Sequence, residues 1–351
     1  MDIKKALSSK LDRRRLLGNL GLMGAGAVMT ACGGQVVGQV GAQQSEDTDF
    51  DASILNFALN LEYLEAAYYL AAVGRLAELP GYDPEKVILP DGYTGTDPNS
   101  SLYAPEFTAS TITKVSDLVS AYAQEIAQDE LDHVVFLRTA LGAAGAPVAE
   151  LPVVNLNTSF IAAASAANSL TSGGIGIDPD AFNAFSADLP FLLGAFIFED
   201  VGVTAYKGAA RFITNPDFLE AAAGILAVEA YHSGALRSFL YSSDNRLENR
   251  YGTDIFTIVQ GISDARDSFS EDDLDQGIAG DPKTGGRANI VPTNENALVF
   301  SRTPFQVAQI VQLNADAANL DVSFFPEGLD IPEELADQFT VLLDPNFPNN
   351  L

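Results

Sequence analysis

The chain has 351 residues, of which 47% are hydrophobic, and this content excludes a wholly disordered protein. Its 47 acidic and 19 basic residues give a formal net charge of −28, which disfavours nucleic-acid binding because phosphate backbones would repel the chain. A single cysteine excludes an internal disulfide framework and any cysteine-rich zinc or iron–sulfur site.

Residues 1–32 have the features of an export signal. A basic start is followed by an apolar, glycine-rich stretch that is shorter than the about 20 residues needed to span a bilayer. The segment DRRRLLGNL resembles a twin-arginine signal, and MTACG resembles a lipoprotein box ending at Cys32. We therefore expect export to the periplasm or cell surface with a lipid anchor at Cys32; the alternative is an incidental thiol and cleavage nearer Ala42. Residues 33–50, rich in Gly and Gln, predict a flexible tether.

From Asp51 onward, apolar residues recur at helical spacing in four long stretches. They cover about 53–79, 111–141, 180–214 and 215–241. The joint at 142–180 is too long for a tight turn and suits a crossover that runs the length of a bundle. Residues 51–243 therefore predict an all-α four-helix bundle with a long crossover.

Each of the four apolar stripes carries a carboxylate, or a carboxylate with a histidine, near its middle. A charged side chain in a core costs several kcal/mol unless it is paired, so four such positions need a common partner. Both histidines of the protein lie in these stripes. The polar positions, in chain order, are Glu62, Glu130 with His133, Glu199, and Glu229 with His232.

An internal repeat relates the two halves of the predicted bundle. The pattern E-x-x-H-x-x-x-L-R occurs at 130–138 and again at 229–237. The glutamates of the other two stripes are each followed seven residues later by a tyrosine, at Tyr69 and Tyr206. These features predict a pseudo-twofold pair of helical hairpins. Asp129, Asp132, Asp200 and Glu125 are interpreted as solvated or hydrogen-bonded flanking residues, with which Arg138 and Arg237 could pair.

The spacing of these residues predicts a dinuclear metal site. In E-x-x-H on a helix, the carboxylate and the imidazole leave the same face and can bind one ion. Two such motifs and two further glutamates supply four carboxylates, whose charge two divalent cations balance, as in di-iron and di-manganese centres of four-helix bundles. Oxygen donors with imidazole suit two Fe or Mn ions per chain, and zinc would be tolerated in recombinant protein. The alternative is that both histidines are satisfied core residues without metal.

The segment NLEYLEAAYY resembles the first-helix motif of the ferritin-like superfamily, and the similarity extends over about 51–243. The resemblance implies one terminal carboxylate for each metal, two bridging carboxylates and one imidazole on each metal. Glu62 and Glu199 would be the terminal carboxylates, Glu130 and Glu229 the bridging carboxylates, and His133 and His232 the imidazole ligands. Glu65 could replace Glu62 or join it, and Tyr69 and Tyr206 would lie just outside the ligands.

A narrower resemblance rests on QDELDHVVFLRTALG, EDVGVTAYKGAA, VEAYHSGALR, SRTPFQVAQIV and FFPEGLD. These segments are similar to exported bacterial ferritin-like proteins that are related to plant desiccation-related proteins. Residues 244–351 are rich in Pro, Gly, Asp and Asn and predict an irregular C-terminal extension with short helices at about 252–266 and 304–313. The sequence carries no phosphate-binding glycine loop, and we expect no catalytic residue beyond the metal ligands.

Two classes of function follow. The first is an exported ferritin-like protein whose dinuclear Fe or Mn centre oxidises Fe(II) or removes peroxide, with O2 or H2O2 as its partner, under oxidative or desiccation stress. The second is a non-catalytic structural or protective envelope protein with a structural or vestigial metal site. Iron storage in a shell fits poorly with the long inserts and the tether. The sequence is compatible with an oligomer and leaves the metal and the oxidant open.

Overall fold

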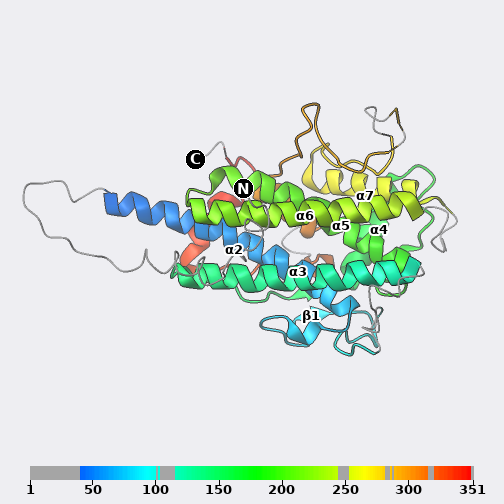
Figure 1. Cartoon of the computed structure of the whole chain (residues 1–351), viewed down its shortest axis with the longest axis horizontal. Coiled ribbons are helices and arrows are strands. Elements are labelled where there is room, and N and C mark those ends of the chain that lie inside the picture. Colours follow the sequence, from blue (N-terminus) through cyan, green and yellow to red (C-terminus); the bar gives the residue numbers. More distant parts are fainter. Residues whose placement is uncertain are drawn as a thin grey trace, which may run out of the picture.

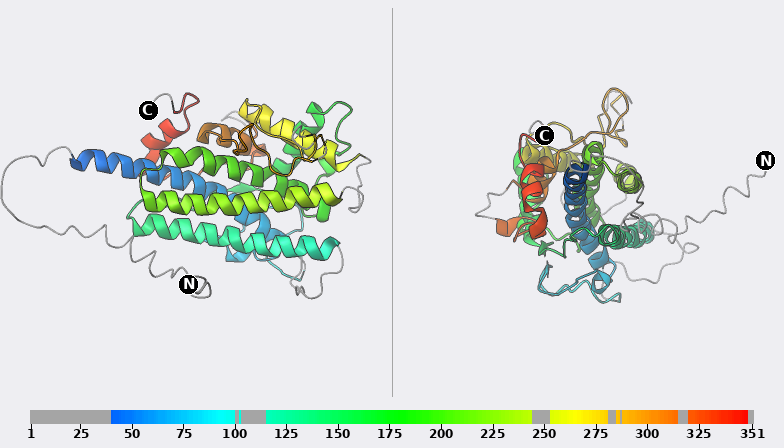
Figure 2. Two further views of the ribbon diagram at one scale, coloured as in Figure 1. Left: turned by 45° about the horizontal axis from the view of Figure 1, so that its top comes forward. Right: turned by 90° about the vertical axis from the view of Figure 1, so that its left-hand side faces the viewer.

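The computed structural model of the chain describes residues 40–99, 102, 115–243, 253–280, 285–286, 288–314 and 320–348. Within these residues the fold is all-α, and its long helices lie side by side as a bundle (Figures 1 and 2). The bundle helices are α2 (Val40–Ala72), α3 (Val115–Ala143), α5 (Asp188–Ala209) and α6 (Pro216–Ser243). Because α2 packs against α3 and α5 against α6, the bundle consists of two helical hairpins.

The first bundle helix differs from its predicted range at both ends. It begins at Val40, inside the segment predicted as a tether, and ends at Ala72 rather than near Leu79. The early end has a local cause, because Gly74 has a φ of 75° and a Cβ there would lie 2.6 Å from the backbone of Pro98. The predicted export signal at 1–32, with Cys32, lies outside the described residues.

The long connection between α3 and α5 is more ordered than the sequence pattern indicates. It contains β2 (Val154–Asn155), α4 (Thr158–Leu170) and the 3₁₀ segment η4 (Pro179–Ala181). Strand β2 pairs in parallel with β1 (Val87–Ile88), with Val87 opposite Val154. The crossover is thereby attached to the loop that follows α2.

The C-terminal extension consists of short helices that pack mainly over α2, α4 and α5. They are α7 (Ile255–Ser270), α8 (Pro304–Val311) and α9 (Ala336–Leu342), with 3₁₀ segments η7 (Leu320–Val322) and η8 (Glu333–Leu335). Thr303 and Gln306 form a capping box at the start of α8. The end-on view in Figure 2 shows α3 and α6 on the side of the bundle away from α9.

The interior of the bundle is closed by apolar and aromatic packing. Among the described helices, the segment Asp188–Phe212 is long and apolar enough to cross a membrane, but its apolar window is 100% buried inside the protein. Tyr68 of α2 stacks on Phe191 of α5, with ring centroids 5.4 Å apart, and donates a hydrogen bond to its carbonyl at 2.6 Å. Helix α5 is therefore a buried core helix of the bundle.

Three fully buried arginines attach the C-terminal extension to the bundle. Arg237 of α6 donates to Asp200 of α5 at 2.7 Å, and Arg266 of α7 donates to the same carboxylate at 3.0 Å. Asp275 pairs with Arg266 at 2.7 Å and with Arg302 at 2.6 Å. Since a buried charge is costly without a partner, this network holds α5, α6 and α7 in one arrangement.

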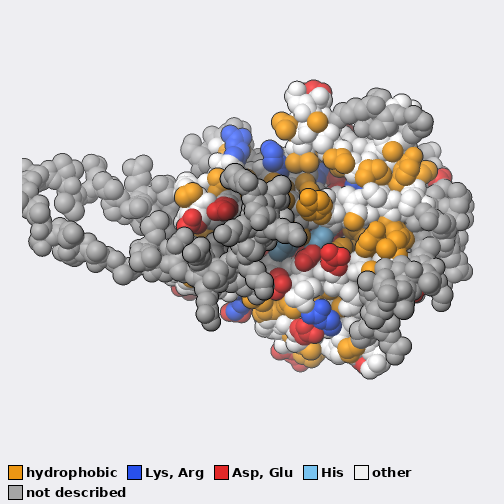
Figure 3. Space-filling model, viewed as in Figure 1, with side chains coloured by type: hydrophobic (Ala, Val, Ile, Leu, Met, Phe, Trp, Pro, Cys, Tyr) orange, Lys and Arg blue, Asp and Glu red, His pale blue; other side chains and the backbone are white. Residues whose placement is uncertain are grey.

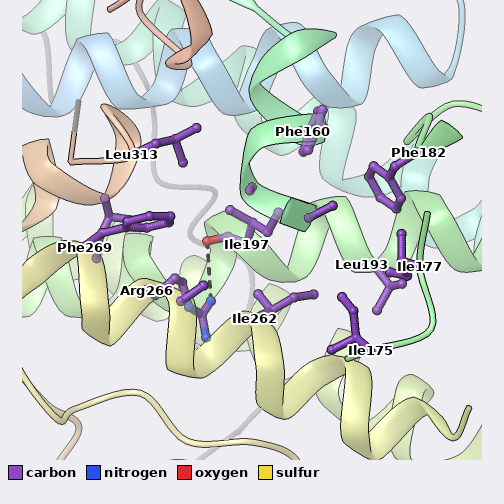
Figure 4. Close-up of a pocket in the computed structure, with 14 residues that line it drawn as sticks. Phe160, Ile175, Ile177, Phe182, Leu193, Ile197, Ile262, Arg266, Phe269 and Leu313 are labelled. Atoms are coloured by element: carbon purple, nitrogen blue, oxygen red, sulfur yellow. Dashed lines mark hydrogen bonds between the residues drawn. The ribbon is translucent and has the colours of Figure 1, made fainter. Parts of the chain in front are cut away.

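Arg266 also borders a pocket between α4, α5, α7 and α8 (Figure 4). Its guanidinium donates to the carbonyl of Ile197 at 3.4 Å, and the rest of the lining is apolar, including Phe160, Ile262 and Phe269. The cavity measures about 20 Å³, which is room for about one water molecule. It is an imperfection of packing that is too small for an organic ligand.

Replacing Arg266 by Met should destabilise the fold. The substitution leaves Asp200 and Asp275 with one arginine fewer in a buried site, at a cost of about 3 kcal/mol in the free energy of unfolding. Urea unfolding of R266M against the unmodified chain measures this loss. The exposed Arg211→Met should change stability by less than about 0.5 kcal/mol, and equal stability of both variants would contradict the role of the network.

Candidate metal centre

All seven predicted or optional ligands lie together in the centre of the bundle. Helix α2 supplies two glutamates, α3 and α6 each supply a glutamate and a histidine, and α5 supplies one glutamate. Each side chain is buried, with between 0% and 8% of its residue surface exposed. The residues are Glu62, Glu65, Glu130, His133, Glu199, Glu229 and His232.

The first metal position lies around His133. Its Nδ1 is 3.0 Å from Glu62 Oε2, 3.4 Å from Glu130 Oε2 and 3.8 Å from Glu229 Oε1. The ligand atoms of these four residues all lie within 4.8 Å of one another. They come from α2, α3 and α6, so this position joins both hairpins.

The second position lies around His232. Its Nδ1 is 3.1 Å from Glu130 Oε1 and 3.4 Å from Glu199 Oε2. Glu130 thus turns one carboxylate oxygen toward each imidazole, which is the geometry expected of a bridging ligand. The chain supplies Glu62 and Glu199 as the outer carboxylates, one for each position.

Glu229, the other carboxylate expected to bridge, is placed differently from Glu130. It belongs to the group around His133 and to a third group with Glu65 and Glu199, rather than to the group around His232. Gly202 of α5 leaves room for the Glu229 carboxylate, because a Cβ at residue 202 would lie only 2.2 Å from Glu229 Oε2. Glu65 and Glu229 therefore face each other beside the two metal positions.

The two repeated tyrosines connect the hairpins at the outer carboxylates. Tyr69 of α2 donates a hydrogen bond to Glu199 Oε1 of α5, and Tyr206 of α5 donates to Glu62 Oε1 of α2. In each glutamate the other oxygen, Oε2, is the atom that faces an imidazole. The tyrosines thus orient the outer ligands, as groups behind a metal ligand do.

Within the described residues, several buried polar atoms of the centre make no hydrogen bond of good geometry, although imidazole and carboxylate atoms lie close together. They are both oxygens of Glu130, both oxygens of Glu229, Glu199 Oε2 and His232 Nδ1. Buried polar atoms are normally hydrogen-bonded, and carboxylates this close repel one another. A pair of divalent cations would satisfy both needs, and the oxygen-rich donor set with two imidazoles fits Fe or Mn. The residues present therefore fit the metal pair that the sequence predicts.

Without metal, the centre retains protons. Burial raises the pKa of Glu62 to about 7, and burial together with neighbouring carboxylates raises the pKa of Glu65 and of Glu229 well above its ordinary value. Burial opposes the charge on His133, but Glu62 and Glu130 outweigh it and raise its pKa to about 12. Metal ions must displace these protons, so binding should weaken as the pH falls.

One residue of the centre was missed at the sequence level. Asp129, interpreted from the sequence as a flanking residue, has its Oδ2 3.1 Å from Nε2 of His232. A carboxylate can only accept, so the imidazole donates this hydrogen bond and keeps Nδ1 for the centre. The available signal was weak: an aspartate directly before Glu130, in a chain with many acidic residues.

The centre approaches the surface between α3 and α6. The residue exposures of His133 and His232 are 8% and 5%, and the side chain of Asp129 is 41% exposed. Figure 3 shows histidine side chains at the surface of this face, beside acidic side chains. Within the described residues, the crossover helix α4 and the extension pack mainly against one another and against α2 and α5 rather than against α3 and α6.

A family model described as a ferritin-like domain matches residues 50–242. The chain belongs to this ferritin-like family. It is 26% identical over 260 residues to the desiccation-related protein PCC13-62 of Craterostigma plantagineum, covering 72% of this chain and 75% of the relative. It is also 22% identical over 287 residues to the ferritin-like catalase Nec2 of Nesocodon mauritianus, covering 79% and 83%. No solved structure matches significantly.

The raised pKa values of Glu62 and His133 determine how the stability of the metal-free protein depends on pH. Glu62 and His133 bind protons more tightly in the folded chain, so each group's contribution to the free energy of unfolding is lost as the pH rises. The loss occurs between the ordinary and the raised pKa, from 4.5 to about 7 for Glu62 and from 6.5 to about 12 for His133. Urea unfolding in the presence of a chelator should give a lower stability at pH 8 than at pH 5, with a contribution from Glu62 on the order of 3 kcal/mol.

Glu62→Gln provides the control. Because an amide cannot ionise, the difference in stability between pH 5 and pH 8 should be smaller in this variant. If the metal-free protein were as stable at pH 8 as at pH 5, or more stable, the folded chain could not hold the protons assigned to Glu62 and His133.

Proposed function

We propose that this chain binds two Fe or Mn ions and disproportionates hydrogen peroxide. The observation that carries the proposal is the position of Glu130, which turns one oxygen toward each of the two imidazoles and so joins two metal positions into one centre. The similarity to a relative named ferritin-like catalase favours peroxide as the substrate. Oxidation of Fe(II) would use the same ligands but has no comparable support.

Six residues would hold the ions. Glu62 and His133 would bind one ion, Glu199 and His232 the other, and Glu130 both. Glu229, whose Oε1 lies 3.8 Å from His133 Nδ1, would complete the first position. Two divalent ions with these ligands would relieve the repulsion among the buried carboxylates.

Bound Fe or Mn supplies a redox couple that exchanges two electrons with each peroxide, so that two H2O2 yield two H2O and one O2. The side chains move and hold the protons of this reaction. Glu65, whose pKa burial and neighbouring carboxylates raise in the metal-free chain, would hold a proton at a carboxyl oxygen beside the metal positions. Tyr69 and Tyr206 keep the outer carboxylates oriented.

A second candidate function is a protective envelope protein whose metal only stabilises the bundle. The similarity to a relative named desiccation-related protein favours it. In this case chelation would lower the melting temperature, and the metal-loaded protein would release no O2 from peroxide. The ligand residues would be the same, so the two functions differ in turnover and not in metal content.

We also propose that the protein is exported and anchored to the outer face of the cytoplasmic membrane through Cys32. The proposal rests on the signal-like residues 1–32 and their single cysteine. Labelling with a radioactive fatty acid in the native host should depend on Cys32. A labelled Cys32→Ser variant would contradict the anchor.

Catalase activity tests the proposal directly. The chain from residue 33 onward, loaded with Fe or with Mn, should contain about two ions and release O2 from H2O2 in an oxygen electrode. Glu130→Ala removes the shared ligand and should lower the rate by at least about 100-fold together with the metal content. Glu125→Ala, an exposed glutamate of the same helix, should keep both. A chain with two ions and no O2 release would favour the protective function.

A further inference from the structure

The outer face of α6 exposes no charge over the greater part of its length. After Glu220, every acidic, basic or imidazole side chain of the helix is buried, with at most 5% of its residue surface exposed; these are Glu229, His232 and Arg237. The exposed positions between 221 and 242 hold alanine, glycine, serine and one tyrosine. Helix α3 differs, because it exposes Glu125 and Asp132. An uncharged helix face is distinctive in a chain with a formal net charge of −28.

Tyr231 projects from this face. Its surface is 78% exposed, more than that of any other large hydrophobic residue in the described parts of the chain. Ala227 and Gly234 lie one turn away on either side, and a Cβ added to Gly234 would contact nothing within 4 Å. The ring therefore stands above a shallow surface of small residues. A tyrosine of this kind contributes strongly to association when a partner buries its ring.

A pocket lies on the same face, between α5, α6 and the C-terminal extension. Its cavity measures about 60 Å³, and it lies at the surface because Val291 in its wall is 65% exposed. Figure 3 shows hydrophobic side chains gathered on this face, beside the histidines. Apolar walls that include Ala230 and Val291 surround a few polar groups, among them Thr204 and Gln276. A phenol combines an apolar ring with a hydrogen-bonding tip, so it matches this lining.

Tyr231 and the pocket lie side by side on α6. Ala230, directly before the tyrosine, and Gly234, three residues after it, both line the pocket. Because its ring is largely exposed, Tyr231 leaves the pocket of its own chain open. In a twofold dimer both copies present the same surface, so a residue that projects beside a pocket can enter the pocket of the other copy reciprocally. The small residues of α6 allow two such helices to approach to about 8 Å.

Charge also favours this face for contact between two copies. Two chains of net charge −28 repel one another, and contact through an acidic surface such as that of α3 would bring like charges close together. Residues 221–242 bring no exposed charge to the contact, and residues 290–300 bring Glu295 alone. Burial of apolar surface would therefore drive association through this face, and long-range repulsion would oppose it.

We propose that two copies of this chain form a twofold dimer through the outer faces of α6, in which Tyr231 of each copy enters the pocket of the other. The pocket and the small residues around Tyr231 carry this proposal, which does not depend on metal binding or on peroxide turnover. The dimer places an interface directly against a ligand-bearing helix, because Tyr231 is the neighbour of His232.

Sedimentation velocity of the protein from residue 33 onward, with and without metal, tests the dimer. It should show a monomer–dimer equilibrium with a dissociation constant in the micromolar range. Raising NaCl from about 0.1 M to about 1 M shortens the screening length from about 10 Å to about 3 Å. Because salt screens the repulsion between the two acidic chains, the dimer should become tighter, whereas an interface held by ion pairs would weaken.

Two variants of the face test its charge and its shape. Tyr231→Asp removes the ring and adds a charge at the contact, so it should weaken the dimer at least about tenfold. Gly234→Gln has room in the monomer but would lie between the two copies, so it should also weaken the dimer. Leu170→Asp is the matched control, because it adds the same charge at a residue of α4 that is 48% exposed, and it should leave the dissociation constant unchanged. Circular dichroism verifies that each variant is folded.

Tyr231→benzoylphenylalanine identifies by photo-crosslinking what the side chain contacts. In a mixture of isotopically labelled and unlabelled copies, cross-links between copies should fall in α6 or in residues 290–300. A protein that stays monomeric at about 1 mM would overturn the proposal, as would a dimer that Tyr231→Asp leaves intact or cross-links between copies that fall only elsewhere. None of these results bears on the metal centre, which metal content and O2 release test separately.

Discussion

The structure depends on one electrostatic constraint: five glutamates and two histidines share the dry centre of a helical bundle. Five carboxylates in this space cannot all remain ionised on their own. Two divalent ions would neutralise four of them, and the fifth would then hold a proton. Glu65, which is not among the six residues that would hold the ions and whose pKa is raised in the metal-free chain, is suited to hold that proton.

Buried ion pairs beside the centre join the ligand-bearing helices to the C-terminal extension. Asp200 follows Glu199 in α5 and accepts from Ser233, the neighbour of His232, at 2.6 Å. The same carboxylate pairs with Arg237 and Arg266, so two ligand-bearing helices and the C-terminal extension meet directly beside the ligands. The α3–α6 face has no comparable cover within the described residues, and there the imidazole edges approach solvent.

The all-α bundle and the membership of the ferritin-like family could be predicted because both depend on local spacing. Residues three and four apart share a helix face, so E-x-x-H repeated in an apolar stripe specifies a helix, its buried face and its ligands. The structure brings those residues together, and their binding of metal remains a prediction. Helix α4, the β1–β2 pair and the contact between Asp129 and His232 depend on residues far apart in sequence. Arg237 illustrates where the limit lies: Asp200 is one of the acidic residues with which the sequence allows it to pair, but its contact with the carbonyl of Asn289 in the extension is not indicated by the sequence.

Anomalous X-ray diffraction from crystals of the protein grown with Fe or Mn tests the central claim most directly. Data collected on both sides of the metal absorption edge identify the element as well as its position. The account predicts two anomalous peaks about 3.5–4 Å apart, one near each histidine and both next to Glu130. Crystals from metal-supplied protein whose centre contains no anomalous peak, with the glutamates hydrogen-bonded to one another through protons, would contradict it.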